Sequence, residues 1–194
     1  LKTVAMENVV DSPRKAFQNS IEKLKEAGAS ISEISVSSVD EAMNLTGLLY
    51  SPEAYATWKH KIEKSPDLMF AKILERFRSG ANVLASDFIN AWDKLVDLRQ
   101  QYHSEVEAFD AILIPTSPII PPEIGRLMND GDFYNSQNLL ALRNTRIGNL
   151  MGGCSITLPT DTPSCGLLIM GRPNEEARLL RLAQACELVL ARNR

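Results

Sequence analysis

Cysteine and histidine are scarce in this sequence, and their scarcity limits the chemistry it can carry. The three cysteines, Cys154, Cys165 and Cys186, are an odd number in a chain of 194 residues. A disulfide framework is therefore not expected, and a reducing, cytoplasmic compartment is predicted. The two histidines, His60 and His103, fall in predicted helices rich in charged residues, far from any cysteine. We expect solvated histidines and no metal site.

Long apolar runs and clusters of basic residues are also absent. No apolar stretch approaches the roughly 20 residues of a membrane-spanning helix. The formal net charge is −3, and lysine and arginine are scattered along the chain. Neither a membrane nor a nucleic acid is therefore expected as a partner. Hydrophobic residues make up 44% of the sequence and charged residues 23%, which is ordinary for a globular protein whose length suits one domain.

Several motifs that identify enzymes are missing. There is no Walker loop, no Gly-x-Gly-x-x-Gly after a strand and no Gly-x-Ser-x-Gly elbow. Cys154 follows two glycines at the predicted end of a helix, where the helix dipole opposes a thiolate, so we expect a packed residue rather than a nucleophile. The first ten residues lack the features of a signal peptide. The chain begins at Leu1 rather than at Met, which suggests a processed or truncated polypeptide.

The stretch FDAILIPTSPIIPP, residues 109–122, is the most distinctive part of the sequence. Its apolar, β-branched run predicts a strand that is buried on both faces. Pro115 ends that strand, and Pro118, Pro121 and Pro122 hold the following residues extended. Such a strand and loop can place residues at the carboxyl edge of a sheet, where ligands bind. An ordinary core strand with a rigid exit loop is the simpler explanation.

Serine–proline pairs predict the starts of three helices before this strand, at residues 12–13, 51–52 and 65–66. Gly28 should end the first of these helices, and Gly80 should end the third.

Other patterns in the first half predict two further helices and a short strand. Ser38 and Glu41 have the spacing of a capping box, so a helix should begin at Val39. Apolar residues spaced by threes and fours predict a long helix over residues 86–108. The β-rich run at residues 31–37 predicts a short strand.

After the proline loop the pattern predicts a turn, two helices and two strands. The turn is at residues 129–132, and Ser136 should cap a helix that ends at Met151 before two glycines. Strands are expected at residues 154–158 and 166–170, and Asn174 should cap a terminal helix.

Three segments in this order resemble the C-terminal half of an amidase signature enzyme. They are FDAILIPTSP (109–118), RNTRIGNLMGGCSITLP (143–159) and CGLLIMGRPNEEARLLRLAQACE (165–187). They carry a Pro-Thr-x-Pro turn, an Asn-Leu-x-Gly segment before a strand that ends in proline, and a Gly-led strand that ends in Gly-Arg. Gly153-Cys154 departs from the usual Gly-x-Pro, and the loop at residues 159–166 is short.

The resemblance implies a helix-rich α/β fold with a mixed β-sheet flanked by many helices. It implies one domain over residues 1–194, with a helical block at about 38–108 and a sheet-forming core at about 109–190. Because half of a larger domain leaves a sheet edge or an apolar face uncovered, a homo-oligomer is expected.

In the amidase signature family a Ser–Ser–Lys triad in a Gly- and Ser-rich stretch cleaves carboxamides without a cofactor. The lysine acts through the bridging serine on the nucleophilic serine, and backbone N–H groups stabilise the oxyanion. The one adjacent serine pair here, Ser37-Ser38, lacks flanking glycines. The resemblance therefore implies no catalytic residue in this chain, which would be an inactive C-terminal fragment.

The resemblance also implies that seven residues line one side of a pocket for a small amide substrate: Thr116, Ser117, Pro118, Ile119, Asn149, Met151 and Cys154. Tight packing and turn formation explain the same residues. Two other functions stay open for the chain. It could be a non-catalytic binding or assembly module, or the amidase-like subunit of a tRNA-dependent amidotransferase.

Overall fold

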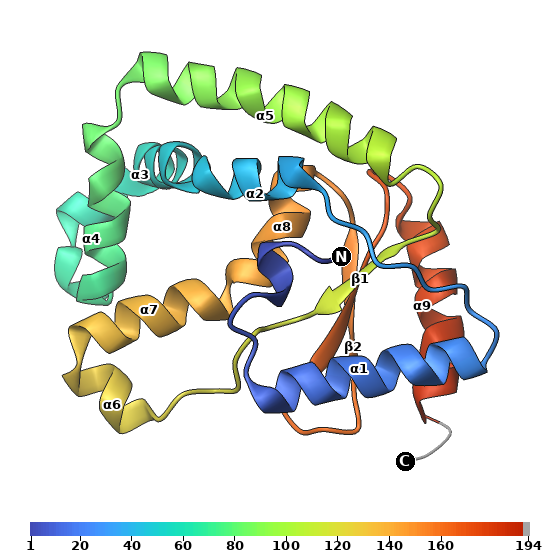
Figure 1. The fold of residues 1–194 in the computed structure, drawn as a ribbon. Helices are drawn as coiled ribbons and strands as arrows, with labels where there is room; N and C mark the ends of the chain where they lie inside the picture. Colours follow the sequence, from blue (N-terminus) through green and yellow to red (C-terminus); the bar gives the residue numbers. More distant parts are fainter. Residues whose placement is uncertain (192–194) are drawn as a thin grey trace.

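The computed structural model describes residues 1–191 and places three short apolar runs in one sheet. They are β1 (Ile112–Pro115), β2 (Ser155–Pro159) and β3 (Gly166–Met170). The strand order is β1-β3-β2, and β3 is antiparallel to both neighbours. The strands β1 and β2 therefore run in the same direction on either side of β3, at the centre of a helix-rich α/β fold (Figure 1).

Each face of the sheet contributes to a separate hydrophobic cluster, because successive strand residues point to opposite faces. Ile112 and Ile114 of β1 belong to the first cluster, and Leu113 packs against the second. In β3 the same alternation puts Leu168 and Met170 in the first cluster and two further residues, Leu167 and Ile169, in the second. The prediction that β1 is covered on both faces is confirmed.

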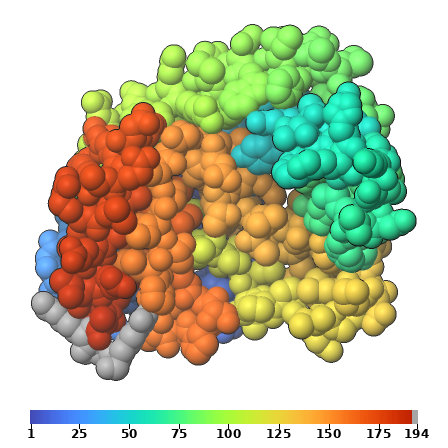
Figure 2. Space-filling model, turned by 180° about the vertical axis from the view of Figure 1, so that it is seen from behind, coloured from blue at the N-terminus to red at the C-terminus, as the bar shows by residue number. Residues whose placement is uncertain are grey.

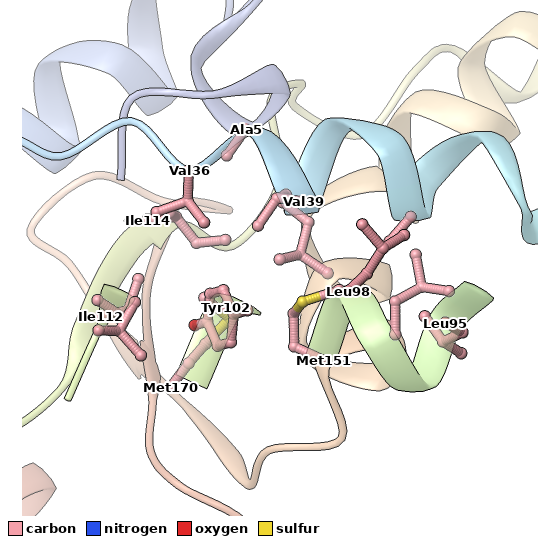
Figure 3. Packing of buried hydrophobic residues seen from close by; sticks show 14 of the residues in the cluster. Ala5, Val36, Val39, Leu95, Leu98, Tyr102, Ile112, Ile114, Met151 and Met170 are labelled. Atoms are coloured by element: carbon pink, nitrogen blue, oxygen red, sulfur yellow. The ribbon is translucent and has the colours of Figure 1, made fainter. Parts of the chain in front are cut away.

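Three helices cover the first face: α2 (Ser37–Asn44), α5 (Ala85–Glu105) and α8 (Arg143–Met151). A short 3-10 helix, η1 (Val4–Met6), completes this layer through Ala5. Figure 3 shows Tyr102 and Met151 converging with side chains of α2 beside Ile114 and Met170. We call this layer the polar-lined face, because it also buries Asn144 and Ser38.

Two helices, α1 (Asp11–Glu26) and α9 (Glu176–Ala191), cover the second face. Leu24 of α1 and Leu179 of α9 pack there against Leu167 and Ile169. We call this layer the apolar face. The helix α3 (Thr46–Lys64) adds Leu49 to the polar-lined face. The remaining elements lie outside the two layers (Figure 1): η2 (Pro66–Leu68), α4 (Ala71–Ser79), η3 (Gly80–Asn82), α6 (Ile124–Asn129) and α7 (Gly131–Ala141).

Several predicted elements are confirmed. The long helix expected at residues 86–108 is α5, and all three strands after residue 109 form near their predicted bounds. Gly28, with φ 99°, and Gly152, with φ 70°, follow α1 and α8 in the left-handed region that favours glycine. Among residues 1–191, no helix is both long enough and apolar enough to cross a bilayer.

The strand predicted at residues 31–37 is wrong. Residues 31–36 form no regular element, and α2 begins at Ser37. Instead, the Lys2 backbone N–H donates to the Ile34 carbonyl at 2.7 Å, and the Ser35 hydroxyl donates to the Lys2 carbonyl at 2.9 Å. The β-rich run thus pairs locally with the start of the chain rather than with the sheet.

The predicted serine caps of the first helices are also wrong. α1 follows Val10 and α2 follows Val36, and neither start has a side-chain cap. Ser38 lies inside α2, where its Oγ is buried without a hydrogen-bond partner among the described residues. The helix begins early enough to bury Val39 completely, so packing outweighs capping here.

The helix start predicted at residues 51–52 is wrong, because Pro52 lies inside α3. The turn before it buries Leu49 completely, and this packing holds the helix across the proline. Gly80 does end α4, as predicted, but at φ −63°. A glycine is needed at this position because the backbone of α3 passes close by, and a Cβ there would lie 2.1 Å from the Ser51 carbonyl oxygen.

The single helix predicted from Ser136 to Met151 is two helices, α7 and α8, joined at Leu142. Asp130 caps α7 by accepting the Phe133 N–H at 2.9 Å, so the predicted turn is a helix start. The preceding helix α6 was not predicted. Asn174 has φ 61° and lies two residues before α9, so it forms a turn rather than the predicted cap.

Candidate functional site

The first four predicted site residues, Thr116–Ile119, form a tight turn at the carboxyl end of β1. The Thr116 N–H donates to the Gly166 carbonyl at 2.9 Å, and its hydroxyl donates to Thr157 Oγ1 at 3.3 Å. The Ser117 hydroxyl donates to the Ile119 carbonyl at 3.0 Å. Pro118 is buried, and its carbonyl accepts the Val10 N–H at 2.9 Å.

The other three predicted residues lie at the opposite end of the sheet. Asn149 and Met151 are in the last turn of α8, and Cys154 immediately precedes β2. The Met151 carbonyl is 3.0 Å from His103 Nε2, and the Cys154 thiol donates to the Arg172 carbonyl at 3.1 Å.

The structure thus does not bring the seven predicted residues together. The strands β1 and β2 run in the same direction. The carboxyl end of β1 and the amino end of β2 therefore lie at opposite ends of the sheet along the strands. Four residues of strand separate the two groups by about 10 Å or more. Asn149 is exposed, whereas Met151 is buried and Cys154 is half-buried.

A buried polar network in α8 connects this helix to the carboxyl end of β1. Asn144 is fully buried, and its Nδ2 donates to the Pro115 carbonyl at 2.7 Å and to the Ala5 carbonyl at 3.0 Å. Arg143 donates to Asn144 Oδ1 at 3.2 Å and to the Glu7 carbonyl at 2.7 Å. The network fixes the position of α8 relative to the sheet.

This network was not predicted, although the sequence carries a signal for it. Asn144, Ile147, Gly148 and Met151 recur at the spacing of one helix face, and all four are buried. A polar residue on a buried stripe needs hydrogen-bond partners inside the protein. The pattern alone therefore indicates an internal role for Asn144.

Asn149 lines two neighbouring hollows on the outer side of α8. The first, about 380 Å³, lies between α3, α4, α7 and α8 and is lined by Tyr50, Arg76 and Arg146 among others. The second, about 290 Å³, lies between α3, α5 and α8, and also includes Tyr50. On the face shown in Figure 2, the orange surface of α8 borders the teal surface of α3.

Basic side chains dominate the electrostatics of the first hollow. Arg146 is half-buried, and its guanidinium has no hydrogen bond or ion pair among the described residues. Desolvation lowers the pKa of Arg146, nearby Tyr50 opposes this shift, and the positive charge of Arg76 adds to it. Burial also raises the pKa of Tyr50, against the opposing effect of Arg146 and Arg99. The Nε of Arg99 donates a hydrogen bond to the Leu150 carbonyl at 2.6 Å.

The two hollows offer arginine, tyrosine and amide groups that can bind a polar ligand. Among residues 1–191, no serine hydroxyl is hydrogen bonded to a lysine or histidine side chain. No three His, Cys, Asp or Glu side chains of this part of the chain gather as a metal site. The Ser37-Ser38 pair lies at the start of α2, with Ser38 inside the core.

Comparison with known proteins gives a consistent result. The sequence model of the family described as Amidase matches residues 2–180. The 2-amino-5-chloromuconic acid deaminase of Comamonas testosteroni is 26% identical over 185 residues, which are 90% of this chain and 39% of that protein. One subunit of the glutamyl-tRNA(Gln) amidotransferase of Desulforamulus reducens is 28% identical over 201 residues, which are 90% of this chain and 41% of that relative.

The fold comparison agrees. The structure of 6-aminohexanoate cyclic dimer hydrolase complexed with substrate superposes with a TM-score of 0.77 at 20% identity. The match covers 96% of this chain and 44% of that one. The predicted fold class is therefore confirmed, with the pairing of the described strands antiparallel. The chain spans about two fifths of the length of the curated relatives it matches.

Proposed function

Because the chain belongs to the amidase family, we propose that it forms part of an enzyme that hydrolyses a carboxamide to a carboxylic acid and ammonia or an amine. The observation that carries this proposal is the family match over residues 2–180. The likeness in fold to 6-aminohexanoate cyclic dimer hydrolase over nearly the whole chain supports it.

The Ser–Ser–Lys triad of this enzyme lies outside the 194 residues, and the chain alone is inactive. Two observations support this part of the proposal. Serine and lysine side chains are not paired anywhere in residues 1–191, and the chain spans about two fifths of its curated relatives. In the complete enzyme a hydroxyl activated by a base attacks the amide carbonyl, and aimed N–H donors stabilise the oxyanion.

This chain contributes the sheet and one side of the acyl pocket, as a single domain. Asn149 contacts the substrate from the hollows beside α8. Thr116, Ser117, Pro118 and Ile119 shape the loop after β1. Met151 holds the junction between α8 and β2 by packing, and Cys154 holds it through the hydrogen bond of its thiol to the Arg172 carbonyl.

The inactivity of the isolated chain can be tested directly. We expect the purified 194 residues to hydrolyse no member of a panel of aliphatic and aromatic amides, and to form no adduct with a fluorophosphonate. Turnover that the reagent abolishes would place a working serine inside this chain. The DNA immediately before the Leu1 codon separates the alternatives, because a Gly- and Ser-rich reading frame there supports an amidase and its absence supports a non-catalytic assembly module.

A second candidate is the amidase-like subunit of a tRNA-dependent amidotransferase. The observation that favours it is the match over 90% of this chain to the glutamyl-tRNA(Gln) amidotransferase component of Desulforamulus reducens. An amidase works without other subunits, whereas this candidate needs them. Amide hydrolysis by the complete gene product expressed alone supports the first candidate, and activity only in the presence of partner proteins and charged tRNA supports the second.

We also propose that the chain self-associates and resides in the cytoplasm. Ile89 and Val96 on α5 are about half exposed, at 57% and 48%, and an apolar strip of this kind favours contact between copies. The three cysteines are free, which suits a reducing compartment. Sedimentation should show dimers or larger species, and a monomer without concentration dependence would contradict self-association.

A further inference from the structure

The hollow of about 380 Å³ beside α8 contains a cationic group without a counter-charge. Arg146 is half-buried in its wall, and its backbone N–H donates to the Leu142 carbonyl, yet its guanidinium forms no hydrogen bond or ion pair with any residue from 1 to 191. Taking a guanidinium partly out of water is unfavourable unless an anion or acceptor replaces the water. A bound anion would therefore stabilise the unpaired guanidinium in this concave site.

A second guanidinium makes the same hollow more positive. Arg76 of α4 lines it opposite α8, and one of its nitrogens donates to Asn138 Oδ1 at 2.7 Å. That bond fixes Arg76 and leaves its other N–H groups free for a ligand. The lining contains no aspartate or glutamate. Glu53 lines the neighbouring hollow, beyond Tyr50, and forms no ion pair with either arginine.

The shape and remaining walls of the hollow favour a planar anion with an apolar part. Two guanidinium groups match the oxygens of a carboxylate through parallel N–H donors. Leu139 and Leu142, each about half exposed, supply an apolar wall. The Tyr50 hydroxyl and the Asn149 amide complete the rim with neutral polar groups.

We propose that the hollow between α3, α4, α7 and α8 binds the carboxylate of an amide substrate that is itself an acid, with Arg146 and Arg76 as the anion-binding residues. The proposal rests on the amidase function proposed above and names its substrate class. Arg146 comes one turn before Asn149 in α8, and the buried Asn144 fixes that helix to the end of β1. The anion is thus held at a defined position relative to the sheet.

Binding of hexanoate and hexanamide to the 194-residue chain tests the proposal without any turnover. We expect hexanoate to shift the arginine side-chain N–H signals and to bind at least about tenfold more tightly than the neutral amide. Raising the ionic strength from about 0.01 M to about 0.15 M should weaken hexanoate binding alone. Inorganic phosphate should bind more weakly than hexanoate, because it has no apolar part to cover Leu139 and Leu142.

Arg146→Gln keeps a long polar side chain without the charge and should weaken hexanoate binding by about tenfold. Arg181→Gln is the matched control, because Arg181 is an exposed arginine of α9 outside the hollow. Equal affinity for hexanoate and hexanamide, equal loss in both variants, or phosphate binding as tight as hexanoate would each overturn the proposal. Failure of the amidase function would appear only in the turnover assays, so the two failures are distinguishable.

Discussion

Apolar packing covers both faces of the sheet, but the polar-lined face adds buried side-chain hydrogen bonds to that packing. On the polar-lined face, hydrogen bonds from Asn144 join α8 to the end of β1 and to the start of the chain. On the apolar face, α1 and α9 contact Leu167 and Ile169 through side chains such as Leu24 and Leu179. Hydrophobic contact is non-directional, whereas a buried hydrogen bond works only in one geometry.

This difference explains where the candidate site lies. The hollow with Arg146 and Asn149 is on α8, and the buried Asn144 joins this helix to the carboxyl end of β1. A binding site needs its groups held in a defined register by their supporting residues. We infer that both faces stabilise the fold through apolar packing, and that the hydrogen bonds of Asn144 additionally fix the position of α8 on the polar-lined face.

The largest expected effect is on the apolar face, from Ile169→Ala. Ile169 is fully buried between the sheet, α1 and α9. Removing its side chain should lower the free energy of unfolding by about 4 kcal/mol, since both transfer energy and a cavity contribute. Urea denaturation measures the loss, and Ile89→Ala on the exposed side of α5 is the control. Equal losses in the two variants would mean that α1 and α9 do not seal this face.

Asn144→Ala should have the next largest effect, on the polar-lined face. It leaves the Pro115 carbonyl without its 2.7 Å hydrogen bond and removes the acceptor of Arg143, so we expect a loss of about 3 kcal/mol. Asn129→Ala is the matched control, because Asn129 makes an exposed 2.8 Å bond to Gly125 and its loss should be under about 0.5 kcal/mol. If both variants unfold at the same urea concentration, Asn144 does not connect α8 to the sheet.

The elements that could be predicted from sequence are those whose apolar pattern is also their packing pattern. The helix α5 has apolar residues at helical spacing, and the strand at residues 112–115 is a short β-branched run that Pro115 ends. The failures occur where a distant residue decides. Residues 31–37 form no strand, because the backbone of Ile34 pairs with Lys2 instead of with the sheet. The helix expected to start at Pro52 begins earlier, because Leu49 enters the core.

The candidate site was predictable only in part, for a related reason. Asn149 was expected from its motif and does line both hollows. The residues that surround it, Tyr50, Arg76 and Arg146, come from α3, α4 and α8. No spacing in the sequence links three helices, so their meeting follows only from the tertiary packing. Thr116 and Ser117, by contrast, have partners close to the end of β1 that satisfy their polar groups.

Alkaline pH should weaken the polar-lined face through Tyr102. Burial raises the pKa of Tyr102 from 10.0 to about 12, so the folded chain keeps the phenol proton longer than the unfolded chain. This contribution is fully present below pH 10 and is lost as the pH rises through 12, amounting to about 2–3 kcal/mol. Unfolding free energies from pH 9 to 12 should fall less steeply for Tyr102→Phe.

The apolar face gives the comparison for this experiment. Burial also raises the pKa of the Cys186 thiol above its ordinary value of 9.0. Cys186→Ala should therefore reduce the fall of the unfolding free energy with pH, and it should do so at a lower pH than Tyr102→Phe does. Identical profiles for the unsubstituted chain and Tyr102→Phe would show that Tyr102 ionises in the folded protein as readily as in the unfolded one.

The smallest effect has the opposite sign and compares one buried serine from each face. Ser38 on the polar-lined face has a buried Oγ without a partner among the described residues, so Ser38→Ala should raise the free energy of unfolding by about 1 kcal/mol. Ser20 in α1, which covers the apolar face, donates to the Ala16 carbonyl at 2.8 Å. Ser20→Ala should therefore not raise the free energy of unfolding. A loss of stability in Ser38→Ala would mean that this hydroxyl is satisfied, and that the polar-lined face buries no unpaired group at Ser38.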